Sequence, residues 1–145
     1  MSATGDATMD DAGTTLIEAL VVVGITAMVA LIGFPRLQRS LAAMAEQQTV
    51  ASVATGLRQA RATALRGDGT VAFAVAGGGR EYGMGGGPVA HAAPGVTLTA
   101  ASARGGRILF YGDGSSSGGV VLVHGVKRTT AVEVRAWGGA VAVAP

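Results

Sequence analysis

The feature that most constrains this chain is the run from Ala19 to Phe34, which contains no charged side chain. Extending the run back to Thr14 adds only one charge, so the whole stretch from Thr14 to Phe34 carries a single carboxylate, that of Glu18. A helix of this length covers about 30 Å, at about 1.5 Å per residue, which is the thickness of a hydrocarbon core. The sequence therefore predicts a membrane-spanning helix near the N-terminus.

Two other interpretations of this run stay open. A buried helix of a soluble domain is seldom this uniformly apolar near a terminus, and a secretory signal peptide combines a basic N-terminal region with small residues at its cleavage site. The segment SLAAMA, at positions 40–45, offers such a site, but positions 1–13 contain no basic side chain. The pattern favours a membrane anchor over a signal peptide.

Glu18 is the unusual residue of the apolar run. An ionised carboxylate in lipid costs on the order of several kcal/mol unless it is neutralised or paired, so it indicates a function. If the chain were cut after Gly13, the new amino group at Thr14 would lie four positions from Glu18. The carboxylate of one subunit could then pair with the terminal ammonium of a neighbour.

The stretch GTTLIEALVVVGITAMVALIGFP, from Gly13 to Pro35, resembles the class III signal of type IV prepilins and type II secretion pseudopilins. That signal combines a Gly, a T-L-I-E motif, a long apolar run and a proline that distorts the helix. The resemblance implies that a prepilin peptidase cuts after Gly13 and methylates the new N-terminus at Thr14. It also implies that Glu18 acts in subunit assembly and that Pro35 is the helix-distorting proline.

The charges on the two sides of the anchor differ from those usual in the family. The leader carries Asp6, Asp10 and Asp11, whereas 11 basic and 5 acidic residues follow Pro35, a net charge of +6. Positive-inside counting alone would place the C-terminal domain in the cytoplasm, and a misassigned start is another explanation for the acidic leader. Thr14 also stands where the family most often has Phe. The register of the motif nevertheless predicts a periplasmic C-terminal domain.

Beyond the anchor the sequence predicts more helix. Pro35 removes a backbone hydrogen bond and predicts a kink or a locally unwound turn at residues 33–35. Glycines on either side of Asp68 predict the end of the helix. An apolar stripe predicts that this part packs on a domain, since residues recur at spacings of three and four at Val53, Leu57, Ala60 and Ala64. The predicted segments are a leader at 1–13, a transmembrane helix at 14–35, an amphipathic helix at 36–66 and a β-rich domain at 67–145.

The C-terminal half of the chain has the pattern of short strands separated by glycine. Six runs rich in Val predict strands at 70–76, 95–100, 107–112, 119–125, 131–136 and 139–144. The glycine-rich residues 76–87 predict a mobile hairpin loop. GDGSSSGG, residues 112–119, predicts a strand-connecting turn because it lacks the lysine and the following helix of a phosphate-binding loop. The predicted fold is α+β and pilin-like, with a long helix packed on an antiparallel sheet.

The C-terminal stretch from Ile108 to Pro145 carries a second resemblance. It resembles the end of the H-type minor pseudopilins and of the FimT-like minor pilins, in which F-x-x-D-G-x-x-x-G-G precedes a strand, a turn and another strand. The pattern falls on Phe110, Asp113, Gly114, Gly118 and Gly119. Together the two resemblances cover the N-terminal anchor and the last quarter of the chain.

The resemblances imply a minor pseudopilin of a type II secretion system, at or near the tip of the pseudopilus. Such a subunit has no catalytic residue, metal or cofactor of its own. Its partners would be other pseudopilins or pilins, the prepilin peptidase, the inner-membrane assembly platform and membrane lipid. A single pass would hold it in the inner membrane with the C-terminal domain in the periplasm. The sequence does not separate a secretion system from a type IV pilus.

Two alternatives remain. The first is a FimT-like minor type IV pilin that binds DNA through Lys127, Arg128 and Arg135, with affinity that falls steeply with salt. Basic residues dispersed among glycines make nucleic acid an unexpected partner. The second is a membrane-anchored periplasmic binding domain or hydrolase. Nothing in the sequence supports it, because His91 and His124 lack metal-ligand spacing, there is no cysteine, and no Ser/His/Asp arrangement or carboxylate pair occurs.

Overall fold

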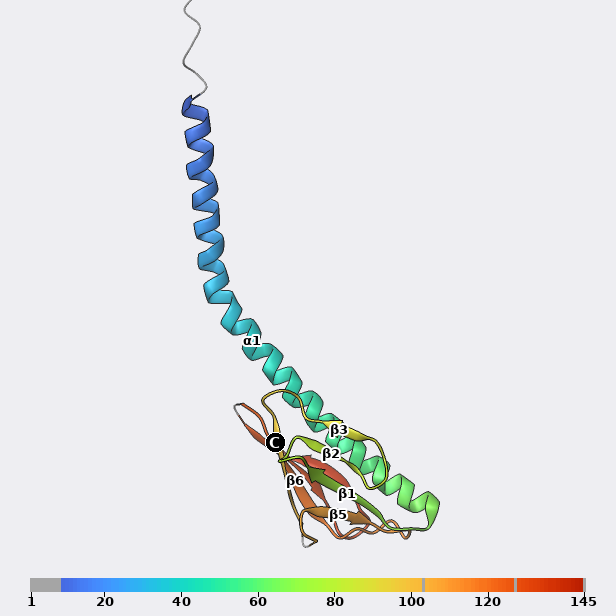
Figure 1. Cartoon of the computed structure of the whole chain (residues 1–145). Helices are drawn as coiled ribbons and strands as arrows, with labels where there is room; N and C mark the ends of the chain where they lie inside the picture. The colour runs from blue at the N-terminus through green and yellow to red at the C-terminus, as the bar shows by residue number, and fades with distance from the viewer. Residues whose placement is uncertain (1–8, 103, 127, 145) are drawn as a thin grey trace, which may run out of the picture. The chain divides into compact units, whose positions relative to one another are not determined.

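The computed structural model describes residues 9–102, 104–126 and 128–144, with side chains described from residue 15 onward. These residues form one long helix and eight strands (Figure 1). The helix α1 is Met9–Gly67; the strands are β1 (Val71–Ala76), β2 (Glu81–Met84), β3 (Val89–His91), β4 (Thr97–Ala101), β5 (Arg107–Phe110), β6 (Gly119–His124), β7 (Thr129–Val134) and β8 (Val141–Ala144). The chain divides into two compact units, Met1–Ser40 and Leu41–Pro145. The second unit is called the head domain below.

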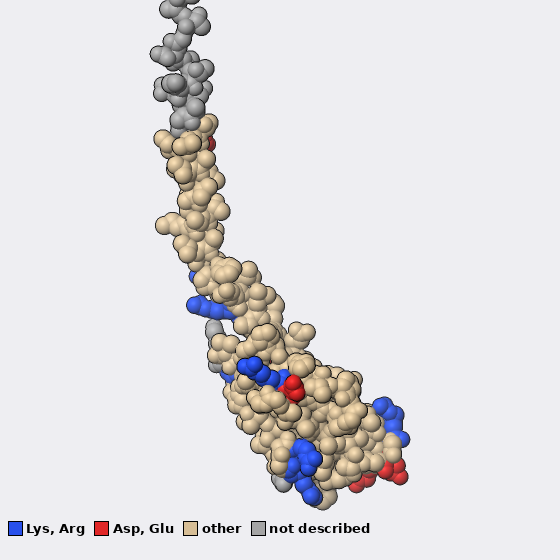
Figure 2. Space-filling view, viewed as in Figure 1, with Lys and Arg blue, Asp and Glu red and all other residues tan. Residues whose placement is uncertain are grey.

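The described part of the first unit is the N-terminal, apolar part of α1. Its side chains are exposed from residue 15 to residue 40, and its most apolar 18-residue window has a mean hydropathy of 2.4 with none of it buried inside the protein. Figure 2 shows this segment as an almost unbroken surface without basic or acidic side chains. The helix is therefore long and apolar enough to cross a membrane. Residues 33–35 keep the helical backbone around Pro35, so the predicted unwound turn is absent and the kink stays a prediction.

The part of α1 in the head domain follows the predicted stripe. Val53, Leu57, Ala60 and Ala64 are fully buried, which confirms the face that the spacing indicated. Burial starts earlier, at Glu46 and Thr49, than the apolar stripe suggested. The helix ends at Gly67, and the backbone of Asp68 has a φ of 47°. A left-handed residue directly after the last turn ends a helix, so the predicted end is confirmed.

Two antiparallel sheets complete the head domain. Sheet 1 has the strand order β3-β2-β1-β5, and sheet 2 has the order β4-β6-β7-β8. All six predicted strands are present, close to their expected bounds. The chain is an α+β protein with one long N-terminal helix packed on antiparallel sheet, a layout consistent with a pilin-like fold, although the sheet is divided in two.

The prediction of a mobile loop at residues 76–87 is wrong. This segment contains β2, which pairs with β1 on one side and β3 on the other. Tyr82 is only 4% exposed, and its ring lies 6.2 Å from that of Phe73. A side chain at Gly83 would come within 2.7 Å of the carbonyl oxygen of Pro88, so this glycine permits close strand pairing. Burial of one aromatic ring therefore orders a segment that its glycine content marks as a loop.

The core lies between α1 and the two sheets. Its largest fully buried side chains are Phe73, Phe110, Leu57 and Ile108, and valines of sheet 2 complete it, namely Val121, Val123 and Val132. Each such side chain contributes about 1.5–3 kcal/mol relative to an exposed one. The core fixes α1 against both sheets and thereby positions the polar groups described next.

Candidate functional site

The predicted processing site lies at the edge of the described structure. The backbones of Gly13 and Thr14 belong to α1, but their side chains lie outside the described residues. Glu18 is described, and its side chain is exposed on α1. No described residue forms an ion pair or hydrogen bond with it. Within the described part of the chain, this carboxylate therefore has no counter-charge.

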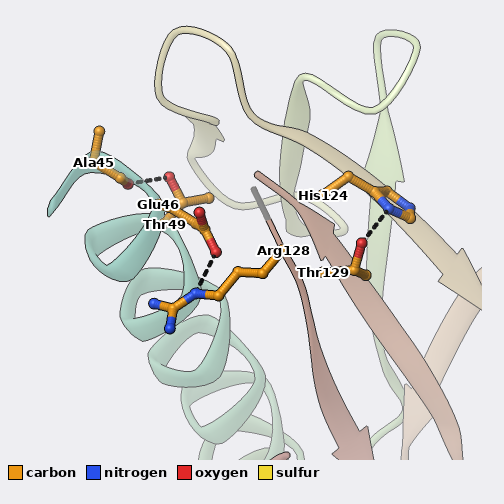
Figure 3. Close-up of polar contacts among 6 residues, drawn as sticks. All are labelled: Ala45, Glu46, Thr49, His124, Arg128 and Thr129. Carbon is orange, nitrogen blue, oxygen red and sulfur yellow. Dashed lines mark hydrogen bonds and ion pairs between the residues drawn. The ribbon is translucent and has the colours of Figure 1, made fainter. Parts of the chain in front are cut away.

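A second glutamate of α1 has a different environment. Glu46 is 5% exposed, and the Nε of Arg128 donates a hydrogen bond of 2.9 Å to its Oε1 (Figure 3). Arg128 stands just before β7, in the turn that follows β6, and its side chain is 57% exposed. The ion pair thus links α1 to the β6–β7 hairpin, with the carboxylate buried and the guanidinium at the surface.

The turn of this hairpin packs closely over the carboxylate. The N–H of Gly125 donates to the carbonyl oxygen of Arg128 at 2.9 Å and closes the turn. A Cβ at Gly125 would overlap the carboxylate of Glu46. One turn further along α1, the hydroxyl of Thr49 donates to the carbonyl of Ala45 and accepts a 3.3 Å hydrogen bond from the N–H of Ala93. Polar contacts therefore attach α1, where burial begins, to the β6–β7 turn and to the segment between β3 and β4.

Sequence reasoning missed Glu46, although a signal was present. Glu46 is the one acidic residue between Ala19 and Gly67, and it lies seven positions before Val53. That spacing extends the buried stripe back by two turns, since residues seven apart share a helix face. A lone carboxylate on a buried face predicts a cationic partner. The identity of that partner, 82 residues away, carries no local signal.

The C-terminal family pattern forms the connection between β5 and β6. Phe110 is fully buried, while Gly114, Gly118 and Gly119 have φ angles of 84°, 68° and 147°. Only glycine adopts such angles without strain, which explains its recurrence in this turn. The hydroxyl and the N–H of Ser115 donate hydrogen bonds of 2.6 and 2.9 Å to the Oδ1 of Asp113. These two bonds lower the pKa of the Asp113 carboxyl, and the bond from the hydroxyl has the larger effect.

The same connection ties the two sheets together. Ser116 donates its N–H to the carbonyl of Ala136 at 2.9 Å and its hydroxyl to the carbonyl of Arg135 at 3.0 Å, both just after β7 of sheet 2. Ser117 exchanges two hydrogen bonds with Leu109 on β5 of sheet 1. The predicted strand-connecting turn is confirmed. Its polar groups bond to the protein itself, so the pattern has a structural explanation.

The three basic residues of the DNA-binding alternative do not form one surface. Lys127 lies outside the described residues, and Arg128 is engaged with Glu46. Arg135 is exposed at the opposite end of β7, seven positions from Arg128, and a strand of that length covers about 23 Å. The described arginines thus lie apart, and one of them is neutralised.

Nothing among the described residues resembles a metal centre. No group of three or more His, Cys, Asp or Glu side chains gathers there. The ring of His124 contacts the hydroxyls of Thr99 and Thr129, each at 3.2 Å, and His91 lies 4.0 Å from Glu81. The chain matches no known protein family, no curated protein and no solved structure. The motifs and the geometry therefore carry the functional argument.

Proposed function

We propose that the chain is a minor pseudopilin of a type II secretion system, a structural subunit that performs no catalysis. One observation carries this proposal. The exposed apolar helix contains Glu18, a carboxylate that no described residue neutralises. Glu18 is the fifth residue after Gly13, which is its place in the prepilin signal. An uncompensated carboxylate in an anchor is expensive, so its retention indicates a partner in another chain.

The proposed mechanism is one of processing and assembly. A prepilin peptidase cuts after Gly13 and methylates the amino group of Thr14. The apolar part of α1 holds the subunit in the inner membrane, with the head domain in the periplasm. The Glu18 carboxylate of one subunit then meets the terminal ammonium of its neighbour, so each charge offsets the cost of the other within lipid. Docking at or near the tip of a pseudopilus follows from the resemblance to the H-type subunits.

Processing tests this proposal directly. The full chain is produced together with the prepilin peptidase of a type II secretion system. The N-terminus of the chain recovered from the membrane fraction is then determined by mass spectrometry. We expect a protein that begins with methylated Thr14. Gly13→Val places a side chain in the peptidase site and should leave the precursor uncut.

Gly24→Val is the matched control for that variant. It lies further along the apolar run, and a Cβ there meets nothing within 4 Å, so it should be cut normally. A wild-type protein that still begins at Met1 in the presence of the peptidase would contradict the proposal. A cut after Ala45 would instead identify a secretory signal peptide.

A further inference from the structure

The last strand of sheet 2 has a free edge. β8 pairs with β7 on one side, and it ends the strand order β4-β6-β7-β8. On its other side, the backbone of residues 141–144 forms no hydrogen bond with any described residue. This strand is short, with four residues, but it contains neither a charged residue nor a proline, two common means by which proteins protect such an edge. An unprotected edge is a template for another strand.

The backbone register shows which groups are free. The N–H of Arg135 donates to the carbonyl of Ala140 at 3.0 Å, so these two residues form a hydrogen-bonded pair. In an antiparallel ladder such pairs alternate with non-hydrogen-bonded pairs, so they recur at every second residue along β8. Ala142 and Ala144 use their backbone groups toward β7, whereas those of Val141 and Val143 point to the free edge. The side chains of these two valines lie on the inner face, opposite the buried Val134 and Val132.

A groove runs between this edge and helix α1. It consists of two adjoining cavities of about 460 and 320 Å³ that share Arg58. Val50 and Ala54 of α1 line it on one side, and Val141 and Val143 of β8 on the other. Val143 remains 47% exposed although its strand neighbour Val132 is fully buried. The inner face of β8 therefore has apolar surface that the head domain leaves uncovered.

The charges along this groove have one sign. Arg58, Arg61 and Arg128 line it, and no described lining residue is acidic. Because Arg128 is paired with Glu46, the positive charge available to a ligand is that of Arg58 and Arg61. We propose that β8 and this groove, the β8 groove, bind an extended segment of another protein that presents apolar and acidic side chains together on one face, at every second residue. The segment adds to sheet 2 as a fifth strand, and on the face turned toward α1 its apolar side chains contact Val141 and Val143 while its carboxylates meet Arg58 and Arg61. This proposal stands on the head domain alone and is independent of cleavage at Gly13.

The other strand edges of the head domain fit this role less well. β3 is very short and follows Pro88, and its His91 lies 4.0 Å from Glu81. β4 and β5, the remaining edges of the two sheets, lie close to each other. Among the described strands, only β8 combines free backbone groups with an adjoining cavity that is lined by arginines and by no acidic residue.

Binding of model peptides to the full chain in detergent micelles tests the proposal. The probe is a fluorescent peptide of about ten residues, the length of a long strand, in which threonine occupies every second position and valine and glutamate share the other positions, so that valine and glutamate lie on one face. Its counterpart has lysine in place of each glutamate. We expect saturable binding of the first and at least about tenfold weaker binding of the second, because like charges oppose each other in the groove. Hydrogen exchange of residues 141–144 should slow when the acidic peptide binds.

Two pairs of variants identify the binding groups. Val143→Pro removes an N–H at the free edge without breaking a bond to β7, so affinity should fall about tenfold, whereas Val143→Thr keeps the N–H and should retain binding. Arg58→Gln combined with Arg61→Gln should weaken binding about tenfold and reduce its salt dependence. Arg66→Gln, on the same helix but outside the groove, should change nothing.

Several outcomes would overturn the proposal. Equal binding of the two peptides would remove the role of charge, and unaltered affinity of Val143→Pro with an intact fold would remove strand addition. Unchanged exchange of residues 141–144 would place the peptide elsewhere. Displacement of the acidic peptide by single-stranded DNA at low salt would instead identify the arginines as a phosphate-binding surface.

Discussion

Arg128 and Glu46 join the β6–β7 hairpin to helix α1 through a hydrogen bond of 2.9 Å between Nε and Oε1. The carboxylate is buried beneath the turn, and the guanidinium reaches it from the surface. Because of this asymmetry, removing Arg128 alone has a different effect on stability from removing both partners. Loss of Arg128 leaves a buried charge without compensation, whereas loss of both charges leaves none.

Arg128→Met should therefore destabilise the head domain by about 2–3 kcal/mol, less than for a fully buried pair because Arg128 is partly exposed. The double variant Glu46→Leu with Arg128→Met should recover most of this loss. Urea denaturation of the full chain in micelles, followed by circular dichroism, measures both. Arg66→Met, in the last turn of α1, serves as the control and should stay within about 0.5 kcal/mol of wild type. Equal stability of Arg128→Met and the control would show that the ion pair is unimportant.

Gly125→Ala should disturb the same contact from the other side. The new Cβ would overlap the Glu46 carboxylate, which must then leave Arg128 or push the turn away. We expect a loss of about 1–3 kcal/mol, the usual cost of overpacking. Gly78→Ala is a useful comparison because a Cβ there meets nothing within 4 Å, although its φ of 68° carries its own strain. If Gly125→Ala in a Glu46→Ala background cost as much as in wild type, the overlap would not be the cause.

Asp113 gives a prediction about pH. Its pKa is lowered from 3.8 by the hydrogen bonds from Ser115, so the folded state favours the ionised carboxyl. The resulting stabilisation is present above the unfolded pKa and is lost as pH falls through the folded value. Asp113→Asn should thus be less stable than wild type near neutral pH, and the difference should shrink once the pH falls below 3.8. Thermal unfolding across this range measures it, with the exposed Glu133→Gln as control. A pH-independent difference would assign the effect to packing.

Substitutions of Glu18 test its proposed role in subunit assembly. Glu18→Ala should be cleaved and inserted normally but should enter the fibre poorly, because the neighbour's terminal ammonium loses a counter-charge worth about a few kcal/mol within lipid. Glu18→Gln keeps the shape without the charge and should resemble Glu18→Ala. Crosslinking to other pilin-like subunits in membranes measures assembly, with processing checked in the same sample. Normal crosslinking of both variants would mean that Glu18 has no assembly role.

DNA binding separates the proposed function from the FimT-like alternative. We expect no salt-sensitive binding of duplex DNA by the full chain, because Arg128 is paired and Arg135 lies at the other end of β7. Fluorescence anisotropy at low and moderate salt measures this. Tight binding that weakens steeply with salt, and that Lys127→Ala or Arg135→Ala reduces, would favour a role in DNA uptake.

Much of the fold was predictable because it depends on local patterns. The stripe from Val53 to Ala64 repeats at helical spacing, and the helix ends at Gly67 directly before Asp68, whose φ of 47° is left-handed. The valine-rich strands alternate as half-buried strands do, for example in β7. In each case neighbours in the sequence are sufficient to determine the structure.

The features that were missed depend on partners distant in sequence. β2 is ordered by the packing of Tyr82 on Phe73, which glycine content does not reveal. The Glu46–Arg128 pair spans 82 residues, and the β8 groove requires knowing that β8 ends its sheet next to α1. The division into two sheets likewise depends on which strands pair. Periodicity identifies strands but contains no information on their order.

The strand order has a consequence for how the head domain unfolds. β4 belongs to sheet 2, yet in the chain it lies between β3 and β5 of sheet 1. Completing sheet 1 therefore requires the chain to return from sheet 2, so no single cut yields a fragment that contains one whole sheet and nothing of the other. We therefore expect the two sheets to unfold together, as one cooperative unit. Unfolding of one sheet would then also remove the support that α1 receives from the other.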